Sequence, residues 1–231
     1  MSAKNEPSNQ APRYDLYGPV HKGLRREFCS LLARMSSVSF GDDAQVQEIV
    51  RDVRFVMDLC AHHLKHENNH FHVALEERSK GASAKKAQEH VEHEKEIAEL
   101  RELAGQLEKA AGPARHEIGR KLYLVYSRFV GENLVHMAEE ELQIQPQFHE
   151  KYSDPELMAI EGKLLGSIAP DVMMAFMRGM IPAMNRDERA GMLGGMKQGA
   201  PPEAFNAVLQ VAAKPSLSEA DWKDLTQRLG I

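Results

Sequence analysis

The chain has 231 residues, of which 42% are hydrophobic and 27% are charged, values typical of a globular protein with a substantial core. Its 29 basic and 34 acidic residues give a net charge of −5, which argues against binding to nucleic acid or to an anionic membrane. No apolar run approaches the roughly 20 residues that span a bilayer, and the first residues lack the apolar stretch of a secretory signal. Only two cysteines occur, which excludes a disulfide scaffold, and we expect a soluble, cytoplasmic protein.

The sequence pattern predicts an all-α fold in three parts. Residues 1–13 are polar and contain prolines, so we expect a disordered arm there. Residues 14–150 carry apolar side chains at spacings of three and four, without the alternation typical of strands. Helices are predicted over residues 17–39, 44–78, 84–110 and 114–145, with turn residues at 41–43, 79–81 and 112–113. Long helices with short connections favour an antiparallel up-and-down four-helix bundle.

Residues 151–231 have a different character. Prolines divide this part into short helical pieces, and methionines are frequent in it: Met173, Met174, Met177, Met180, Met184, Met192 and Met196. Because methionine adapts to irregular gaps, we interpret these side chains as packing the short helices together and onto the bundle. The segment is therefore predicted to be a helical C-terminal appendage, and a methionine-rich groove for a protein partner is the alternative.

Histidine and glutamate recur at a spacing that suits metal binding. Four histidines have a glutamate four residues later, in the pairs His63/Glu67, His72/Glu76, His90/Glu94 and His136/Glu140. This spacing places both side chains on one face of a helix. Imidazole is a ligand for iron, zinc and copper, and a carboxylate can bridge two ions. Polar groups on the inward face of a bundle are costly unless they have partners, and a metal would be a partner for several at once.

The positions of these residues along their helices favour one common site. Residues that meet at the same height in an up-and-down bundle are equidistant from the intervening turn. With His21 as the inward histidine of the first helix, the turns should fall near residues 43, 79 and 115, and the turn residues lie within about one helical turn of these positions. The sequence therefore predicts a metal site at mid-bundle, formed by His21, His63, Glu67, His90, Glu94, His136 and Glu140.

The four predicted helices carry, in chain order, a histidine, an HxxxE pair, another histidine and a second HxxxE pair. This order resembles the pattern of the hemerythrin-like HHE cation-binding family. The segments that carry the resemblance are VHKGLR from residue 20, HLKHENNHFHVALEE from residue 63, EHVEHE from residue 89 and ENLVHMAEEE from residue 132. It covers about residues 14–150 and implies a non-haem di-iron centre that binds or senses oxygen or a related small oxidant. It also implies a ligand set in which His21 and His63 bind one iron, His90 and His136 bind the other, and Glu67 and Glu140 bridge them.

The chain departs from the oxygen-carrying hemerythrins on its third helix. Those proteins have a second histidine four residues after the first, where this chain has Glu94, and His93 is the neighbouring alternative. A carboxylate there favours ferric iron, so we expect sensing, iron handling or oxidative chemistry rather than oxygen transport. His72, paired with Glu76, is expected to orient a ligand from outside the centre. Oxygen, peroxide, nitric oxide and iron itself all remain candidate ligands, and enzymatic activity is left open.

Two other functions fit parts of the sequence. The chain could be an iron-dependent or redox-dependent interaction module that signals through its C-terminal helices, since metal binding favours the folded state. Residues 66–70 also spell HExxH, the zinc-hydrolase motif with two histidine ligands and a glutamate as general base. The polar residues within that motif argue against a buried zinc helix, and the motif leaves His21, His90 and His136 unexplained.

Overall fold

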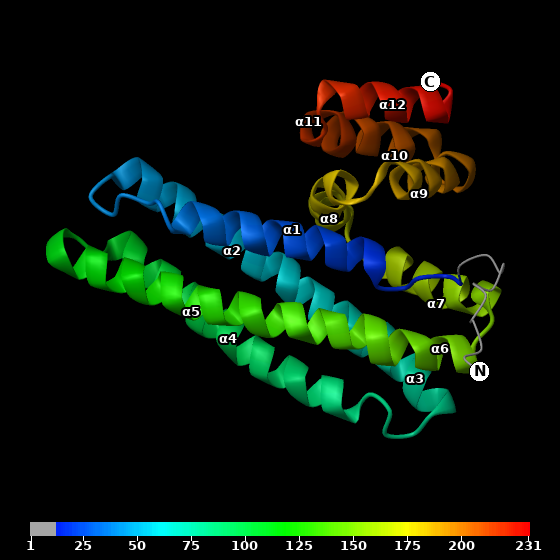
Figure 1. Cartoon of the computed structure of the whole chain (residues 1–231), viewed down its shortest axis with the longest axis horizontal. Helices are drawn as coiled ribbons and strands as arrows, with labels where there is room; N and C mark the ends of the chain where they lie inside the picture. The colour runs from blue at the N-terminus through cyan, green and yellow to red at the C-terminus, as the bar shows by residue number, and fades with distance from the viewer. Residues whose placement is uncertain (1–12) are drawn as a thin grey trace, which may run out of the picture.

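The computed structural model describes residues 13–231, and all its regular secondary structure is helical (Figure 1). The expected all-α fold is confirmed, with no strand in the described part of the chain. Residues 1–12, for which a disordered arm was expected, lie outside the described residues. No helix within residues 13–231 has both the length and the apolarity needed to cross a membrane.

Four long helices lie side by side and form a helical bundle (Figure 1). They are α1 (Gly18–Met35), α2 (Asp43–His66), α4 (Ala84–Lys109) and α5 (Gly112–Glu139). Helix α1 packs against α2 and α5, and α4 packs against the same two helices, so the four enclose a common interior.

Two of the long helices continue through a π-helical turn into a further α-helix. After α2 come η1 (Glu67–Phe71) and α3 (His72–Arg78). After α5 come η2 (Glu140–Ile144) and α6 (Gln145–Lys151). The second and fourth predicted helices therefore each correspond to a helix interrupted by one wider turn, and the fourth extends past its predicted end at residue 145.

The connections between the long helices use the turn residues expected from the sequence. The Asp42 side chain accepts hydrogen bonds from two backbone N–H groups in the first turn of α2. Gly81 and Gly112 have φ values of 81° and 57°, in the left-handed region that glycine adopts without steric cost. The Glu76 carboxylate accepts hydrogen bonds from the backbone N–H groups of Gly81 and Ser83, which holds the turn that leads into α4.

The bundle contains two apolar clusters, one on each side of a polar layer. The larger cluster fills the part between the α1–α2 connection and the middle of the bundle, and includes Leu24, Phe28, Val53, Val56, Cys60, Leu100, Phe129 and Met137. The smaller cluster fills the other end, and includes Leu16, Tyr17, Phe71, Leu75, Ile144, Phe148, Tyr152 and Leu157. His21, Glu67 and Glu140 each lie between a residue of the larger cluster and a residue of the smaller one on their helices.

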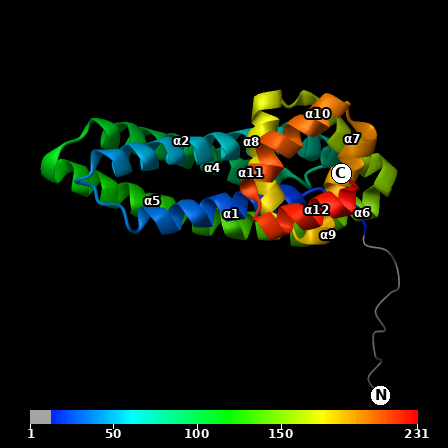
Figure 2. The ribbon, with the colours of Figure 1, turned by 90° about the horizontal axis from the view of Figure 1, so that it is seen from above.

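The C-terminal residues contact the bundle in two places (Figures 1 and 2). Helix α7 (Asp154–Ser167) packs against η1 at one end of the bundle, whereas α8 (Pro170–Ala183) packs across α1. The α1–α8 crossing is close because α1 has a glycine there: a Cβ atom on Gly23 would lie 2.9 Å from Cγ of Met180 and 3.1 Å from its backbone nitrogen.

The remaining helices form a second core with α8. Their bounds are α9 (Arg186–Gly199), α10 (Pro202–Ala207), the π-helix η3 (Val208–Ala213), α11 (Lys214–Ser216) and α12 (Glu219–Leu229). The core between them is apolar, and five methionines pack against it: Met174, Met177, Met180, Met192 and Met196. These side chains therefore pack between the short helices, as the sequence predicts.

Candidate metal centre

Six of the seven predicted ligands meet in the polar layer between the two apolar clusters. Each of the six is buried, and they come from all four long helices and from the first residue of each π-helix: His21, His63, Glu67, His90, His136 and Glu140. The four histidines are thus brought together from positions more than twenty residues apart in the sequence. The cluster therefore forms only when the four helices pack together.

The two glutamates occupy equivalent positions in the chain. Glu67 is the first residue of η1 and Glu140 is the first residue of η2, so each HxxxE pair ends where a π-helical turn begins. Short π-helical turns within α-helices occur frequently at functional sites, because the wider turn changes the direction of the side chains that follow. Here the wider turn follows the residue that must point into the bundle.

The six residues form two overlapping groups with the geometry of metal-binding sites. His21 and His63 make up one group with the two glutamates, and His90 and His136 make up the other with the same two glutamates. Within each group the ligand atoms all lie within 4.8 Å of one another. The cluster could therefore hold metal ions, and both carboxylates belong to both groups.

The oxygens of Glu67 are divided between the two groups. Its Oε1 atom lies 3.2 Å from Nε2 of His63 and 3.6 Å from Nε2 of His21. Its Oε2 atom lies 3.4 Å from Nε2 of His90. The Glu67 carboxylate thus presents one oxygen to each of the two groups.

Glu140 is placed in the same way at the end of α5. Its Oε2 atom lies 3.4 Å from Nε2 of His21. Its Oε1 atom lies 3.2 Å from Nε2 of His136 and 3.7 Å from Nε2 of His90. Each carboxylate therefore lies close to histidines of both groups.

Among the residues that the structure describes, several inward atoms of the cluster find no hydrogen-bond partner. They are Nε2 of His21, Nε2 of His63 and both carboxylate oxygens of Glu67 and of Glu140. A buried polar atom without a partner costs about 1–3 kcal/mol, and more when it is charged. Metal ions are electron-pair acceptors that satisfy nitrogens and carboxylate oxygens together, so the residues fit such a group.

The outer nitrogens of three histidines are held by side chains from neighbouring helices. Nδ1 of His21 lies 2.9 Å from the carboxylate of Glu141, which also accepts a hydrogen bond from Arg25 at 2.6 Å. Because an ionised carboxylate only accepts, the imidazole donates from Nδ1 and turns Nε2 towards the centre. Such partners fix the orientation of a metal-binding histidine and raise its basicity.

The other two histidines have equivalent partners. Nδ1 of His90 lies 2.7 Å from Oδ1 of Asn68, and Nδ1 of His136 lies 2.8 Å from Oε2 of Glu89. The sequence interpretation missed Glu141, Asn68 and Glu89. Each of the three is the direct neighbour in sequence of a residue in the cluster, but this adjacency does not indicate which histidine it contacts.

The structure corrects the assignment of Glu94. Its side chain is exposed, so it does not join the cluster. His93 is buried instead, with its ring centre 4.9 Å from that of His136 and its Nδ1 3.3 Å from a carboxylate oxygen of Glu96. The helix places residues three apart, not four apart, on the inward face at this height, and His93 borders the cluster without belonging to either metal-binding group.

His72 borders the cluster too, but through stacking. Its ring stacks on that of His90, with 4.8 Å between the ring centres and 24° between the ring planes. Glu76, its expected partner, instead accepts hydrogen bonds from the turn before α4. Tyr17 is fully buried one helical turn before His21, with the two ring centres 5.2 Å apart.

The residues of the HExxH motif point in different directions. Glu67 points into the cluster, whereas Nε2 of His70 lies 3.2 Å from the hydroxyl of Ser167 on α7. The rings of His66 and His70 are 6.4 Å apart, and neither histidine belongs to a metal-binding group among the described residues. The arrangement therefore does not unite the two histidines and the glutamate in one site.

Burial and nearby charges shift the pKa values of several residues in the cluster. Burial lowers the pKa of His21, but the neighbouring carboxylates of Glu141, Glu67 and Glu140 outweigh it and raise that pKa to about 9. Burial raises the pKa of Glu67, and repulsion from Glu140 adds to this. For Glu140, the close imidazoles of His136 and His90 and the charge of His21 outweigh burial and lower the pKa. The centre therefore attracts positive charge to its two carboxylates.

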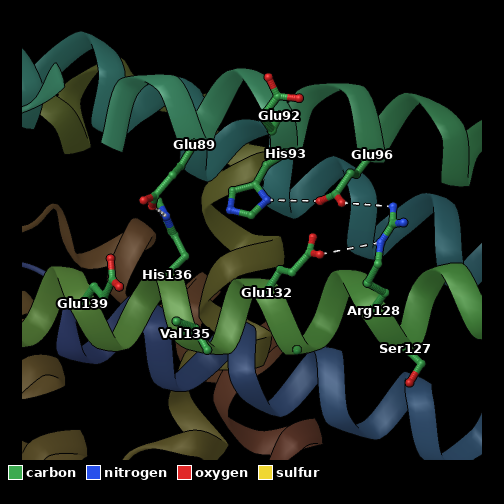
Figure 3. A pocket seen from close by; sticks show the side chains of 11 residues that line it. Glu89, Glu92, His93, Glu96, Ser127, Arg128, Glu132, Val135, His136 and Glu139 are labelled. Carbon is green, nitrogen blue, oxygen red and sulfur yellow. Dashed lines mark hydrogen bonds and ion pairs between the residues drawn. The ribbon is translucent and has the colours of Figure 1, made fainter. Parts of the chain in front are cut away.

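An acidic groove of about 550 Å³ runs along the outside of the centre, between α4 and α5 (Figure 3). Glu89, Glu132 and Glu139 line it together with His136. Lys86, with only 2% of its surface exposed, lies beneath the groove and donates to Glu89 at 2.7 Å and to Glu139 at 2.8 Å. This lysine holds Glu89 in place for its contact with His136.

The chain was compared with family models, with curated proteins and with solved structures, and none of them matches it.

Proposed function

We propose that the chain is a hemerythrin-like protein, an antiparallel up-and-down four-helix bundle that holds a non-haem di-iron centre and binds or senses dioxygen or a related small oxidant. The observation that carries the proposal is the pair of overlapping groups that share both carboxylates. Two separate single-ion sites would have no need to share them, whereas a pair of ions bridged by carboxylates requires it.

In this proposal each residue of the cluster has a definite task. His21 and His63 would hold one iron, His90 and His136 would hold the other, and Glu67 and Glu140 would bridge the two. Imidazole and carboxylate together are a donor set well suited to iron. When bound, the irons would supply the electrons for holding or reducing a small oxidant.

The other residues maintain the site. Glu141, Asn68 and Glu89 keep the Nδ1–H groups of three histidines occupied, so that the Nε2 lone pairs face inwards. The two apolar clusters exclude water from both sides of the polar layer. Low local polarity strengthens the interaction of the two carboxylates with any cation between them.

Metal analysis and absorption spectroscopy of the purified protein test the proposal. We expect about two irons per chain and the near-ultraviolet bands of a carboxylate-bridged ferric pair. Mixing the reduced protein with oxygen then distinguishes a stable adduct from turnover. One tightly held zinc without iron would contradict the proposal.

A second candidate is an iron-dependent interaction module. The α1–α8 crossing favours it, because Gly23 contacts Met180 of α8 only two residues from His21. A change at the centre would then be transmitted to the C-terminal helices and their protein partner. An α8 that keeps the same hydrogen exchange with and without iron would contradict this candidate.

A further inference from the structure

A small cavity lies between the bundle and the segment formed by α7 and α8. Its volume is about 80 Å³. The start of α1 and the junction of α2 with η1 form one side of it. The other side is formed by apolar side chains of α7, α8 and their connection: Leu164, Leu165, Ile168, Met173, Phe176 and Met177.

The cavity reaches one half of the metal centre. His63 and Glu67 are part of its wall, and both have an inward atom without a hydrogen-bond partner. His90 and His136 do not line this cavity, and His136 lines the acidic groove between α4 and α5 instead. The two halves of the centre therefore adjoin different surroundings, one apolar and one acidic.

The chemistry of the wall restricts what the cavity can take. Its other polar residues are His66 and Glu161, and the Glu161 carboxylate accepts a hydrogen bond from Tyr14. No lysine or arginine of the described residues lines the cavity, so no permanent positive charge of the protein would neutralise an anion there. Since one water occupies about 30 Å³ in the liquid, the space suits a molecule of two or three heavy atoms.

We infer that small, uncharged, apolar molecules such as dioxygen or nitric oxide reach the centre through this cavity, and that the α7–α8 segment forms its gate. The inference deepens the proposed function and rests on it. Leu165 is placed at the mouth, since it lines the cavity and is 44% exposed. Peroxide, which needs hydrogen-bond partners, and iron ions, which are charged, fit this wall poorly.

Xenon tests the cavity without any metal. Xenon binds in dry apolar cavities, so crystals of the metal-free protein under xenon pressure should show one xenon atom between His63 and Leu165. Leu165→Trp should remove it by filling the mouth. A structure under xenon with no atom at this position would overturn the inference.

Nitric oxide association with the reduced, iron-loaded protein, measured by stopped flow, tests the gate. Leu165→Trp should slow association by about tenfold and Leu165→Ala should accelerate it, with iron content unchanged in both. Leu124→Trp, an equally exposed leucine on α5, is the matched control and should leave the rate unchanged.

The two proposals fail in different ways. If both Leu165 variants keep the wild-type rate while iron content and spectrum are normal, the inference is wrong and the proposed function stands. If the protein binds no iron, the proposed function is wrong, and the xenon experiment still decides whether the cavity takes apolar molecules.

Discussion

At the scale of single residues, the cluster combines ligands that a pattern can predict with partners that it cannot. The spacing of the HxxxE pairs and their distance from the turns were enough to predict six of the residues that meet. The assignment of Glu94 as a ligand was wrong, because a shift of one residue along a helix rotates the side-chain direction by about 100°. His93 faces inwards in its place.

The partners of the histidines were missed for a physical reason. Glu141, Asn68 and Glu89 are each adjacent in sequence to a cluster residue, and adjacent residues on a helix point to different faces. Each of the three reaches a histidine on another helix. Only the packing of the bundle determines these pairings, so a sequence without coordinates does not reveal them.

Replacing one inward histidine tests the ligand assignment. We expect His136→Ala to lower the iron content by about half or more, since it removes a nitrogen from one of the two groups. His149→Ala is the control, because His149 hydrogen-bonds to Gln145 and to the backbone of Tyr14 at the end of the bundle. Elemental analysis of both purified variants measures the effect, and equal iron loss in the two would contradict the assignment.

Replacing an outer partner tests how the histidines are held. Glu89→Ala should weaken iron affinity by about 10-fold to 100-fold, because His136 loses the acceptor for its Nδ1–H. Glu89→Gln keeps an oxygen acceptor and should restore much of the affinity. Competition with a chelator gives the values, and Glu92→Ala in the same groove, whose carboxylate pairs with Lys95, should behave like the wild type.

At the scale of elements, the predicted helices were found but their irregularities were not. Residues 44–78 and 114–145 read as continuous helices, because apolar periodicity over a long window is insensitive to one wider turn. The π-helices at Glu67 and Glu140 shift the register of everything that follows. After each wider turn the chain returns to the apolar interior, at Phe71 and at Ile144, which are both buried.

The close crossing of α1 and α8 should be sensitive to one added side chain. Gly23→Val would drive its side chain into the backbone of Met180, and we expect a loss of about 1–3 kcal/mol in the free energy of unfolding. Gly105→Ala on α4 is the matched helical control, because a Cβ there meets no atom within 4 Å. In urea unfolding, Gly105→Ala should be as stable as the wild type or up to about 1 kcal/mol more stable. If both variants unfold at the same urea concentration, the crossing contributes nothing.

The junction between α3, α6 and α7 should respond to acid. The side chain of Arg78 donates to Glu156 at 2.6 Å and lies 3.8 Å above the ring of Tyr152. Arg78 and the N-terminal cap at Ser153 hold the pKa of Glu156 at about 2, below its usual value of 4.5. A lowered pKa stabilises the fold above pH 4.5, and this contribution is lost as the pH falls from 4.5 towards 2.

Glu156→Gln therefore has an effect that depends on pH. At pH 7 the variant should melt at a lower temperature than the wild type, and the difference should shrink as the pH falls from 5 towards 3. Thermal unfolding followed by circular dichroism across this range measures it. A difference that stays constant with pH would show that the carboxylate charge is not involved, and Glu150→Gln, at an exposed position on α6, is the control.

At the scale of the whole molecule, the sequence predicted the bundle but not the way the C-terminal helices cover it. Periodicity shows which face of a helix is apolar, but not which element packs on that face. The expected appendage proved to contact the bundle twice, through α7 at its end and α8 across α1 (Figure 2). Contacts of this kind depend on shape at single positions such as Gly23.

Removing the metal should lower the stability of the entire fold. Without ions, the inward atoms of Glu67, Glu140 and two histidines have no partners in the middle of the bundle. We expect a chelator-treated protein to melt about 5–15 °C lower than the iron-loaded one. Calorimetry of both forms provides the test, and re-addition of iron should restore the midpoint. Identical melting curves would mean that the cluster is satisfied without ions.

The sharing of Glu67 and Glu140 makes the centre unequally tolerant of mutation. Losing one histidine deprives a single half of a ligand and leaves the rest in place. In the proposed centre, the loss of either carboxylate removes a ligand from both halves at once. A substitution at Glu67 or at Glu140 therefore affects the binding of both ions. Random mutagenesis with selection for iron retention should therefore recover partly loaded variants at the histidine positions and almost none at the two glutamates.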